Sequence, residues 1–205
     1  MSGALPSVPI TANGGNSLLV IIFGSCHAGS SVGSVSDANG DNFQSLVQAN
    51  GVLNDDVLDV YLATNIKGGV SDISSSLTSQ SSCGSLGSII VREYVGAVHG
   101  MDISATSIFD FTNTTGPISV SLTTNEPNEM LVGIYVGDLS IAEGNGGMAD
   151  FSNPFLSLYQ QHVLSDAPFA VEDVAAPTAG PNSVAFYEGS NGPNYGGEIW
   201  ALAIY

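Results

Sequence analysis

Basic residues are almost missing from this sequence. Lys67 and Arg92 are the only lysine and arginine among 205 residues, against 19 acidic residues, and the formal net charge is −17. Nucleic-acid backbones and anionic membrane surfaces are bound through lysine and arginine, which neutralise phosphate groups and release counterions. The composition therefore excludes nucleic acids and anionic membranes as partners.

Long apolar runs are missing as well. No stretch approaches the roughly 20 apolar residues that cross a bilayer as a helix, and residues 1–6 have neither the basic start nor the apolar core of a secretory signal. We therefore expect no membrane span. A removed signal, a cytoplasmic protein and a virion component all fit this N-terminus, and a polar coat of Ser, Thr, Asn and Gly favours an extracellular or cell-surface location.

Cysteine is scarce too. Cys26 and Cys83 are the only two, and each lies beside an apolar segment. An even count in a chain of secreted type favours a disulfide between them, which the chain-entropy model values at about 4 kcal/mol for a loop of this length. Two separate buried thiols are the alternative, and a lone pair without CxxC spacing is not expected to bind a metal ion.

The residues that are abundant indicate strands. Apolar and β-branched segments alternate with Gly, Asn and Pro turns, and no window keeps a helical period. This pattern predicts an all-β protein of about a dozen strands, folded as a two-sheet, jelly-roll-like β-sandwich. Residues 18–23 and 89–91 are continuously apolar, so we predict that they form central strands covered on both faces.

Residues 8–23 and 120–135 repeat each other without a gap, at an offset of 112 residues. Each copy reads as a short strand, an Asn/Gly/Pro turn and an apolar strand, which predicts the same β-hairpin twice. We interpret the copies as the two halves of one sandwich domain over residues 8–205, preceded by an N-terminal segment of residues 1–7. Two tandem domains are the alternative.

A series of hydrophobic patterns and turns has a recognisable order. It consists of residues 15–20, 34–43, 57–64, 72–78, 89–97, 128–133 and 200–204. In this order the segments resemble a jelly-roll, lectin-like β-sandwich module that is widespread in secreted bacterial and archaeal surface proteins. The resemblance covers nearly the whole chain and implies the fold, but it implies no activity and no functional residue.

One turn has the composition of a cation site. Asp37, Asn39 and Asp41 place three oxygen-bearing side chains at alternating positions around a glycine, which is similar to half of a calcium-binding loop. The later glutamate of the full loop is missing. Calcium is therefore the one candidate cofactor, and a plain hairpin turn is the alternative.

Patterns of catalytic residues are missing. The histidines lack the spacing of a zinc site, and there is no Gly-x-Ser-x-Gly elbow. A glycosidase needs two carboxyl groups held in one cleft. The candidates do not form an alternating acidic pair on a strand: Glu93, Asp102, Glu126 and Glu129. We therefore expect no enzyme.

Two weaker patterns concern sugars. Trp200, Tyr187 and Tyr195 are candidates for an aromatic platform that stacks on sugar rings, although aromatic residues in apolar strands also serve as core. Asn113 starts an Asn-Thr-Thr glycosylation sequon, which matters only in an exported protein.

These observations favour a structural or binding role. We expect an extracellular structural subunit that self-assembles into a homopolymer, as a filament or pilus-like appendage, in which residues 1–7 reach a neighbouring subunit and extend its sheet. Because basic residues are so few, intersubunit contacts must be apolar, hydrogen-bonded or bridged by cations. The alternatives are a carbohydrate-binding or adhesive module, and a viral structural protein.

Overall fold

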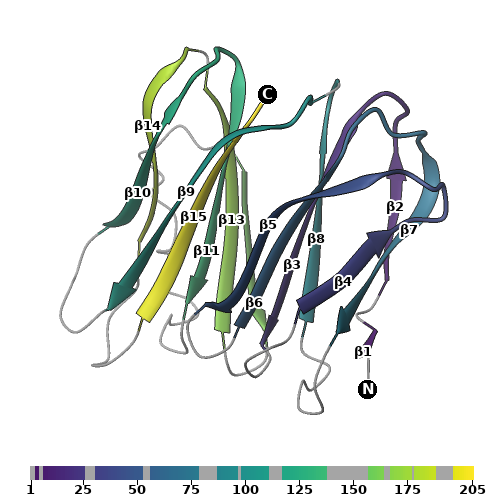
Figure 1. Cartoon of the computed structure of the whole chain (residues 1–205), viewed down its shortest axis with the longest axis horizontal. Helices are drawn as coiled ribbons and strands as arrows, with labels where there is room; N and C mark the ends of the chain where they lie inside the picture. The colour runs from purple at the N-terminus through teal and green to yellow at the C-terminus, as the bar shows by residue number, and fades with distance from the viewer. Residues whose placement is uncertain are drawn as a thin grey trace. The chain divides into compact units, whose positions relative to one another are not determined.

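The fold is all-β, as the sequence predicts. The structure is a computed structural model (Figure 1) that describes residues 3–4, 7–25, 31–52, 56–78, 87–96, 98–110, 117–137, 157–163, 167–176, 178–187 and 196–205. All regular elements within these ranges are strands, and their ladders are antiparallel. No helix in this part of the chain has the length and apolarity of a membrane span.

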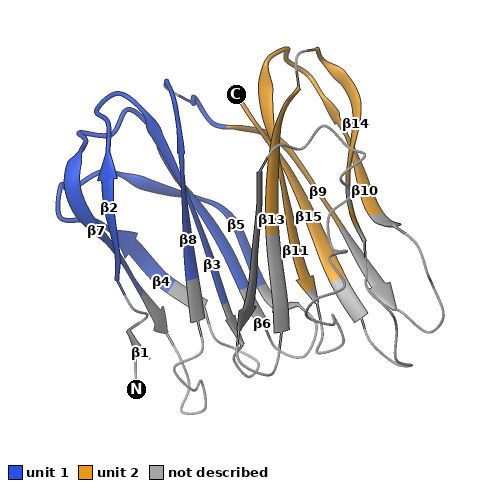
Figure 2. Cartoon of the chain, turned by 180° about the vertical axis from the view of Figure 1, so that it is seen from behind, with its two compact units in different colours: residues 1–100 blue, residues 101–205 orange. Residues whose placement is uncertain are grey.

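The chain divides into two compact units, Met1–Gly100 (unit 1) and Met101–Tyr205 (unit 2), which Figure 2 shows in different colours. Each unit has its own hydrophobic core. The single sandwich domain expected over residues 8–205 stays a prediction.

Unit 1 contains eight strands within its described residues. They are β1 (Gly3–Ala4), β2 (Val8–Ala12), β3 (Ser17–Ser25), β4 (Ser31–Ser36), β5 (Phe43–Val52), β6 (Asp56–Ala63), β7 (Gly69–Thr78) and β8 (Gly87–Tyr94). One sheet has the order β5-β6-β3-β8, and in the other sheet β7 pairs with β1, β2 and β4. Side chains from both sheets meet in the core of this unit, which is a two-sheet sandwich.

Unit 2 contains seven strands within its described residues. They are β9 (Met101–Asp110), β10 (Pro117–Thr124), β11 (Glu129–Gly137), β12 (Ser157–Val163), β13 (Ala167–Ala176), β14 (Gly180–Tyr187) and β15 (Gly196–Ile204). One sheet has the order β12-β13-β11-β15-β9, and β10 pairs with β14 in the other. The pairing scheme repeats that of unit 1. In unit 1, β3 lies between β6 and β8, and in unit 2, β11 lies between β13 and β15, which follow it in the same order along the chain.

The two predicted hairpins are wrong in their pairing. β2 pairs with β7 while β3 pairs with β6 and β8, and β10 pairs with β14 while β11 pairs with β13 and β15. Both edges of β3 and of β11 are paired with strands of their own sheet. The strands that precede them, β2 and β10, therefore lie in the opposite sheet. Each connection therefore crosses between sheets, and we call residues 13–16 arch 1 and residues 125–128 arch 2.

The gapless alignment of the two copies does not extend through the arches. Leu18 and Val20 face the core of unit 1, whereas Leu131 and Tyr135 face the core of unit 2. The offset of 112 residues aligns Leu18 with Met130 instead. Aligned residues of β3 and β11 thus lie on opposite faces of their sheets, because side chains alternate with a period of two.

The reason is the length of the connection. Eight positions separate the core residues Ile10 and Leu18 in unit 1, and nine separate Leu122 and Leu131 in unit 2. The path from the core face of one sheet to the core face of the next is therefore one residue longer in unit 2, although arches 1 and 2 both have four residues, and this extra position turns over the faces of the strand that follows.

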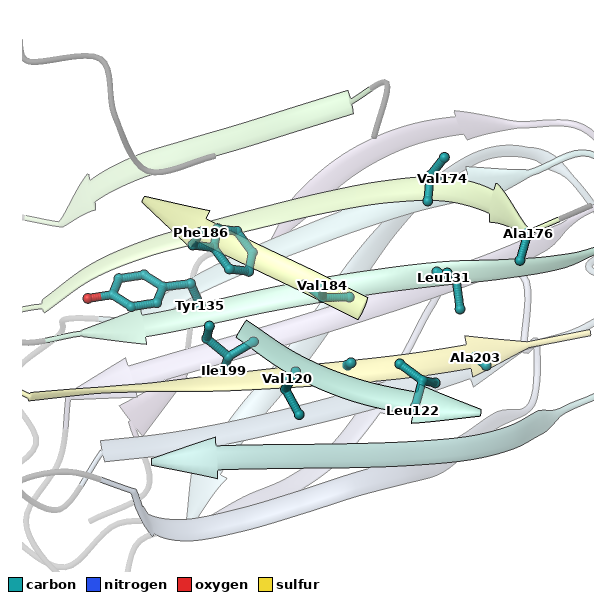
Figure 3. Packing of buried hydrophobic residues seen from close by; sticks show 11 residues of the cluster. Val120, Leu122, Leu131, Tyr135, Val174, Ala176, Val184, Phe186, Ile199 and Ala203 are labelled. Carbon is teal, nitrogen blue, oxygen red and sulfur yellow. The ribbon is translucent and has the colours of Figure 1, made fainter. Parts of the chain in front are cut away.

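Residues 18–23 form a central strand covered on both faces, as their continuous apolar run predicts, whereas the prediction for residues 89–91 is wrong: they lie in β8, which ends its sheet beside β3, and Ile89 and Val91 are only partly buried. Every residue from 18 to 23 is at most 1% exposed. In unit 2 the rings of Tyr135 and Phe186 lie 5.7 Å apart between the two sheets, in the cluster that Figure 3 shows. Gly133 lies in the middle of β11, where a Cβ atom would overlap Val184 Cγ1.

The N-terminal segment lies in part within the chain's own sheet. Gly3 and Ala4 form β1 and pair with Leu77 and Ser76 of β7. An intersubunit role for residues 1–7 stays a prediction, and the observed ladder offers it no support because the backbone of these two residues already has a partner strand.

Candidate functional site

An open cleft of about 700 Å³ lies beside arch 2. Its lining residues come from the start of β9, from the arch and from the residue after β15: Met101, Asp102, Glu126, Pro127, Asn128 and Tyr205. Asn128 has a φ of 63°, a left-handed conformation that asparagine tolerates better than most residues. Unit 2 contains no lysine or arginine, so no side chain of either type in this unit offsets the carboxylates of the cleft.

Asp102 fastens arch 2 to β9. Its carboxylate accepts hydrogen bonds from the Asn125 backbone N–H and from Asn125 Nδ2, each at 2.8 Å. These bonds favour the charged form, so the side-chain bond and then the backbone bond of Asn125 hold the pKa of Asp102 below its ordinary value.

Glu129 is the first residue of β11 and is fully buried. Its Oε1 accepts the Glu126 backbone N–H at 3.2 Å, while its buried Oε2 accepts no hydrogen bond. Burial, and then the charge of Asp102, raise the pKa of Glu129. A hydrogen bond between Glu129 and Asp102 also raises the pKa of Glu129 and lowers that of Asp102, and such a bond requires a proton on one of the two carboxyl groups.

Arch 1 is fastened in a related way. Glu93 Oε1 accepts the Asn13 backbone N–H at 2.8 Å, Asn13 Nδ2 at 3.3 Å and Asn16 Nδ2 at 2.6 Å. The backbone bond of Asn13, followed by the side-chain bond of Asn16, lowers the pKa of Glu93. Asn16 Oδ1 also accepts the Gly96 N–H at 3.1 Å.

The two arches therefore contain the same three-part arrangement, which we call the arch clamp. An asparagine that opens the arch, Asn13 or Asn125, donates to a carboxylate, Glu93 or Asp102. A buried polar side chain two residues before the first core-facing leucine completes the clamp, and it is Asn16 in arch 1 and Glu129 in arch 2. The sequence shows asparagines in both turns but not these partners, because the carboxylates lie on distant segments.

The predicted calcium turn is held by hydrogen bonds within the chain. Asp37 Oδ1 accepts the Asp41 N–H at 2.8 Å, and Asp37 Oδ2 accepts the Ser71 hydroxyl at 3.2 Å. Asn39 Nδ2 donates to the Gly68 carbonyl at 3.0 Å. These contacts connect the turn to the segment that enters β7.

A lysine ammonium group lies against the same turn. Lys67 Nζ donates to the carbonyl oxygens of Asn39 and Gly40 at 2.6 and 2.9 Å, and the Lys67 N–H donates to Asp41 Oδ1 at 3.0 Å. Within the part of the chain that the structure describes, no group of three or more His, Cys, Asp or Glu side chains is arranged to hold a metal ion. Calcium at Asp37, Asn39 and Asp41 stays a prediction.

Of the predicted sugar platform, the structure describes the side chain of Trp200 alone. Trp200 is partly buried in β15 and lies on the same face as Glu198, two residues away, whose Oε1 accepts the Thr106 hydroxyl at 2.8 Å. Burial raises the pKa of Glu198. Tyr187 ends β14, and its side chain lies outside the described residues, as does the whole of Tyr195.

The modification sites also fall outside this part of the chain. Cys26, Cys83 and Asn113 all lie in segments that the structure does not describe, so the disulfide and the glycosylation site stay predictions. No family model matches the sequence, and neither a curated protein nor a solved structure is similar to it.

Proposed function

We propose that this chain is an extracellular structural subunit that self-assembles, as a filament or pilus-like appendage. The observation that carries the proposal is the use made of its acidic side chains. Within the described residues, five carboxylates each accept a backbone N–H of a turn or loop: those of Asp37, Asp41, Glu93, Asp102 and Glu129. A carboxyl group that serves as a general acid or base exchanges a proton with its substrate, whereas these groups hold the backbone in place, which supports a structural role.

The distribution of charge limits how copies can associate. Unit 1 contains seven of the 19 acidic residues and both basic ones, while unit 2 contains the other 12 acidic residues and no lysine or arginine. Copies of such a chain repel each other near neutral pH. Acid or divalent cations should therefore favour assembly, and the contacts themselves must be apolar or hydrogen-bonded.

Unit 1 offers apolar side chains for such contacts. Val70 is 79% exposed at the start of β7, and Val95 is 94% exposed just after β8. Both lie near arch 1, since Val70 pairs with Thr11 and Gly96 donates to Asn16. We propose that these two valines are buried when copies associate.

Carbohydrate binding is the second candidate, and the cleft beside arch 2 is the observation that favours it. Tyr205 is 45% exposed there and lies with Asp102, Glu126 and Asn128. An aromatic face together with acceptors for hydroxyl groups is a common arrangement in sites that bind sugars. A glycan-array screen of the full chain, compared with a Tyr205→Ala variant, tests this candidate.

Negative-stain electron microscopy of the purified full chain tests the proposal. We expect regular polymers at about pH 4, or near neutral pH with millimolar calcium, and fewer polymers in a Val70→Ser/Val95→Ser variant. Thr11→Ser, which removes a methyl group opposite Val70, is the matched control and should assemble normally. Monomers under every condition would contradict the proposal, and closed shells would indicate a viral structural protein instead.

A further inference from the structure

The clamp of arch 2 contains two carboxyl groups, those of Asp102 and Glu129. The clamp of arch 1 contains one carboxylate, Glu93, and one amide, Asn16. Asp102 of β9 accepts the backbone N–H of Asn125, and Glu129 of β11 accepts the next N–H along the chain, that of Glu126. In arch 1 the corresponding contact joins Asn16 Nδ2 to Glu93 Oε1 at 2.6 Å. An amide always has a hydrogen to donate, but two ionised carboxylates have none.

The groups that surround Glu129 offer no positive charge. Glu126 from the arch and Tyr205 from the end of β15 are the other ionisable residues at the cleft. Ala176 pairs with Glu129 in the β11–β13 ladder, and β10 contains no ionisable residue. In β14 the one ionisable residue, Tyr187, lies at the end of the strand far from Gly180 and arch 2.

We propose that Glu129 and Asp102 share one proton under arch 2. This proton supplies the hydrogen bond that the Asn16 side-chain amide supplies in arch 1. Its loss with rising pH loosens arch 2. The proton lies on Glu129 Oε2, the buried oxygen that otherwise has no partner, and it is donated to the Asp102 carboxylate. Asp102 keeps its charge and its two bonds from Asn125.

The pH range follows from the direction of the two shifts. Asp102 has a lowered pKa, so its bonds contribute to stability above its unfolded value and are lost as pH falls through its folded value. Glu129 has a raised pKa, so it destabilises the fold increasingly as pH rises from its unfolded value through its folded value. Arch 2 is therefore firmest near the unfolded pKa values of the two groups, and it loosens as pH falls toward the folded value of Asp102 or rises toward the folded value of Glu129.

Carbon-detected NMR of the full chain tests this proposal, with the Glu129 carboxyl resonance followed against pH. We expect the pKa of Glu129 to lie above about 4.3, the ordinary value of a free glutamate. Hydrogen-exchange protection of the Asn125 and Glu126 amides, corrected for the intrinsic rate, should fall over the same pH range, because these amides bond to the two carboxyl groups.

Two variants make the comparison between arches. Glu129→Gln supplies a permanent donor and should keep the Asn125 amide protected on the alkaline side, with the loss on the acid side unchanged. Asn16→Asp places a second carboxyl group beside Glu93 and should bring an alkaline loss of Asn13 amide protection into arch 1, where the wild type has none.

Three results would overturn the proposal. They are titration of Glu129 at or below the free value, an unchanged alkaline loss in Glu129→Gln, and recovery of protection by calcium at a pH where Glu129 is ionised. The last would assign a metal ion to the place that we assign to a proton. The outcome is independent of whether the chain polymerises, because both readings are local to arch 2.

Discussion

Individual residues decide how closely the two sheets of unit 2 approach. Gly133 has no Cβ, and the space that a Cβ would need is filled by Val184, with Glu172 and Phe186 close by. The sequence does not reveal this role, because a glycine within a strand pattern predicts equally a bulge or a close approach. The contact across the sheets distinguishes the two.

We predict that Gly133→Ala destabilises the chain by about 1–3 kcal/mol through overpacking, since Val184 must move or leave its rotamer. Urea unfolding measures the change. Ser121→Ala, at an exposed position of β10, is the matched control and should shift stability by less than about 0.5 kcal/mol. Equal stability of Gly133→Ala and wild type would show that the sheets can separate without cost.

Lys67 is a second single residue with a structural effect. Its ammonium group donates hydrogen bonds to two carbonyl oxygens of the Asp37–Asp41 turn, those of Asn39 and Gly40. We predict that Lys67→Met lowers the free energy of unfolding by about 1 kcal/mol, a small value because the side chain is exposed. Lys67→Arg keeps the charge and should lose less. Calcium that raises the melting temperature of Lys67→Met but not of wild type would show that the ammonium group occupies a cation site.

At the scale of elements, the sequence predicts strands well and their partners poorly. Residues 18–23 are a buried central strand, as their apolar run indicates. The Asn/Gly/Pro turns predict hairpins, but they join two sheets, because a local turn signal does not say whether the strands beside it pair. The arch clamps escaped prediction for the same reason, since Glu93 lies 80 positions from Asn13.

The clamp of arch 1 should make unit 1 sensitive to acid. The pKa of Glu93 is lowered mainly by the Asn13 backbone bond, so its contribution is present above the unfolded value of about 4.3 and disappears as pH falls through the folded value. We predict that Glu93→Gln unfolds with a weaker dependence on pH in this acid range than wild type. Urea midpoints measured from pH 3 to 7 check this, and parallel curves for the two proteins would contradict it.

At the scale of the whole molecule, one pairing scheme is used twice in a chain with almost no positive charge. Among the described residues, carboxylates of the turns hold the backbone, and the exposed Val70 and Val95 offer apolar side chains for the contacts that we propose between copies. Sedimentation velocity of the full chain at decreasing pH tests self-assembly most directly. The account predicts large, reversible species as repulsion is neutralised toward about pH 4, whereas a single monomer boundary throughout, with or without calcium, would contradict it.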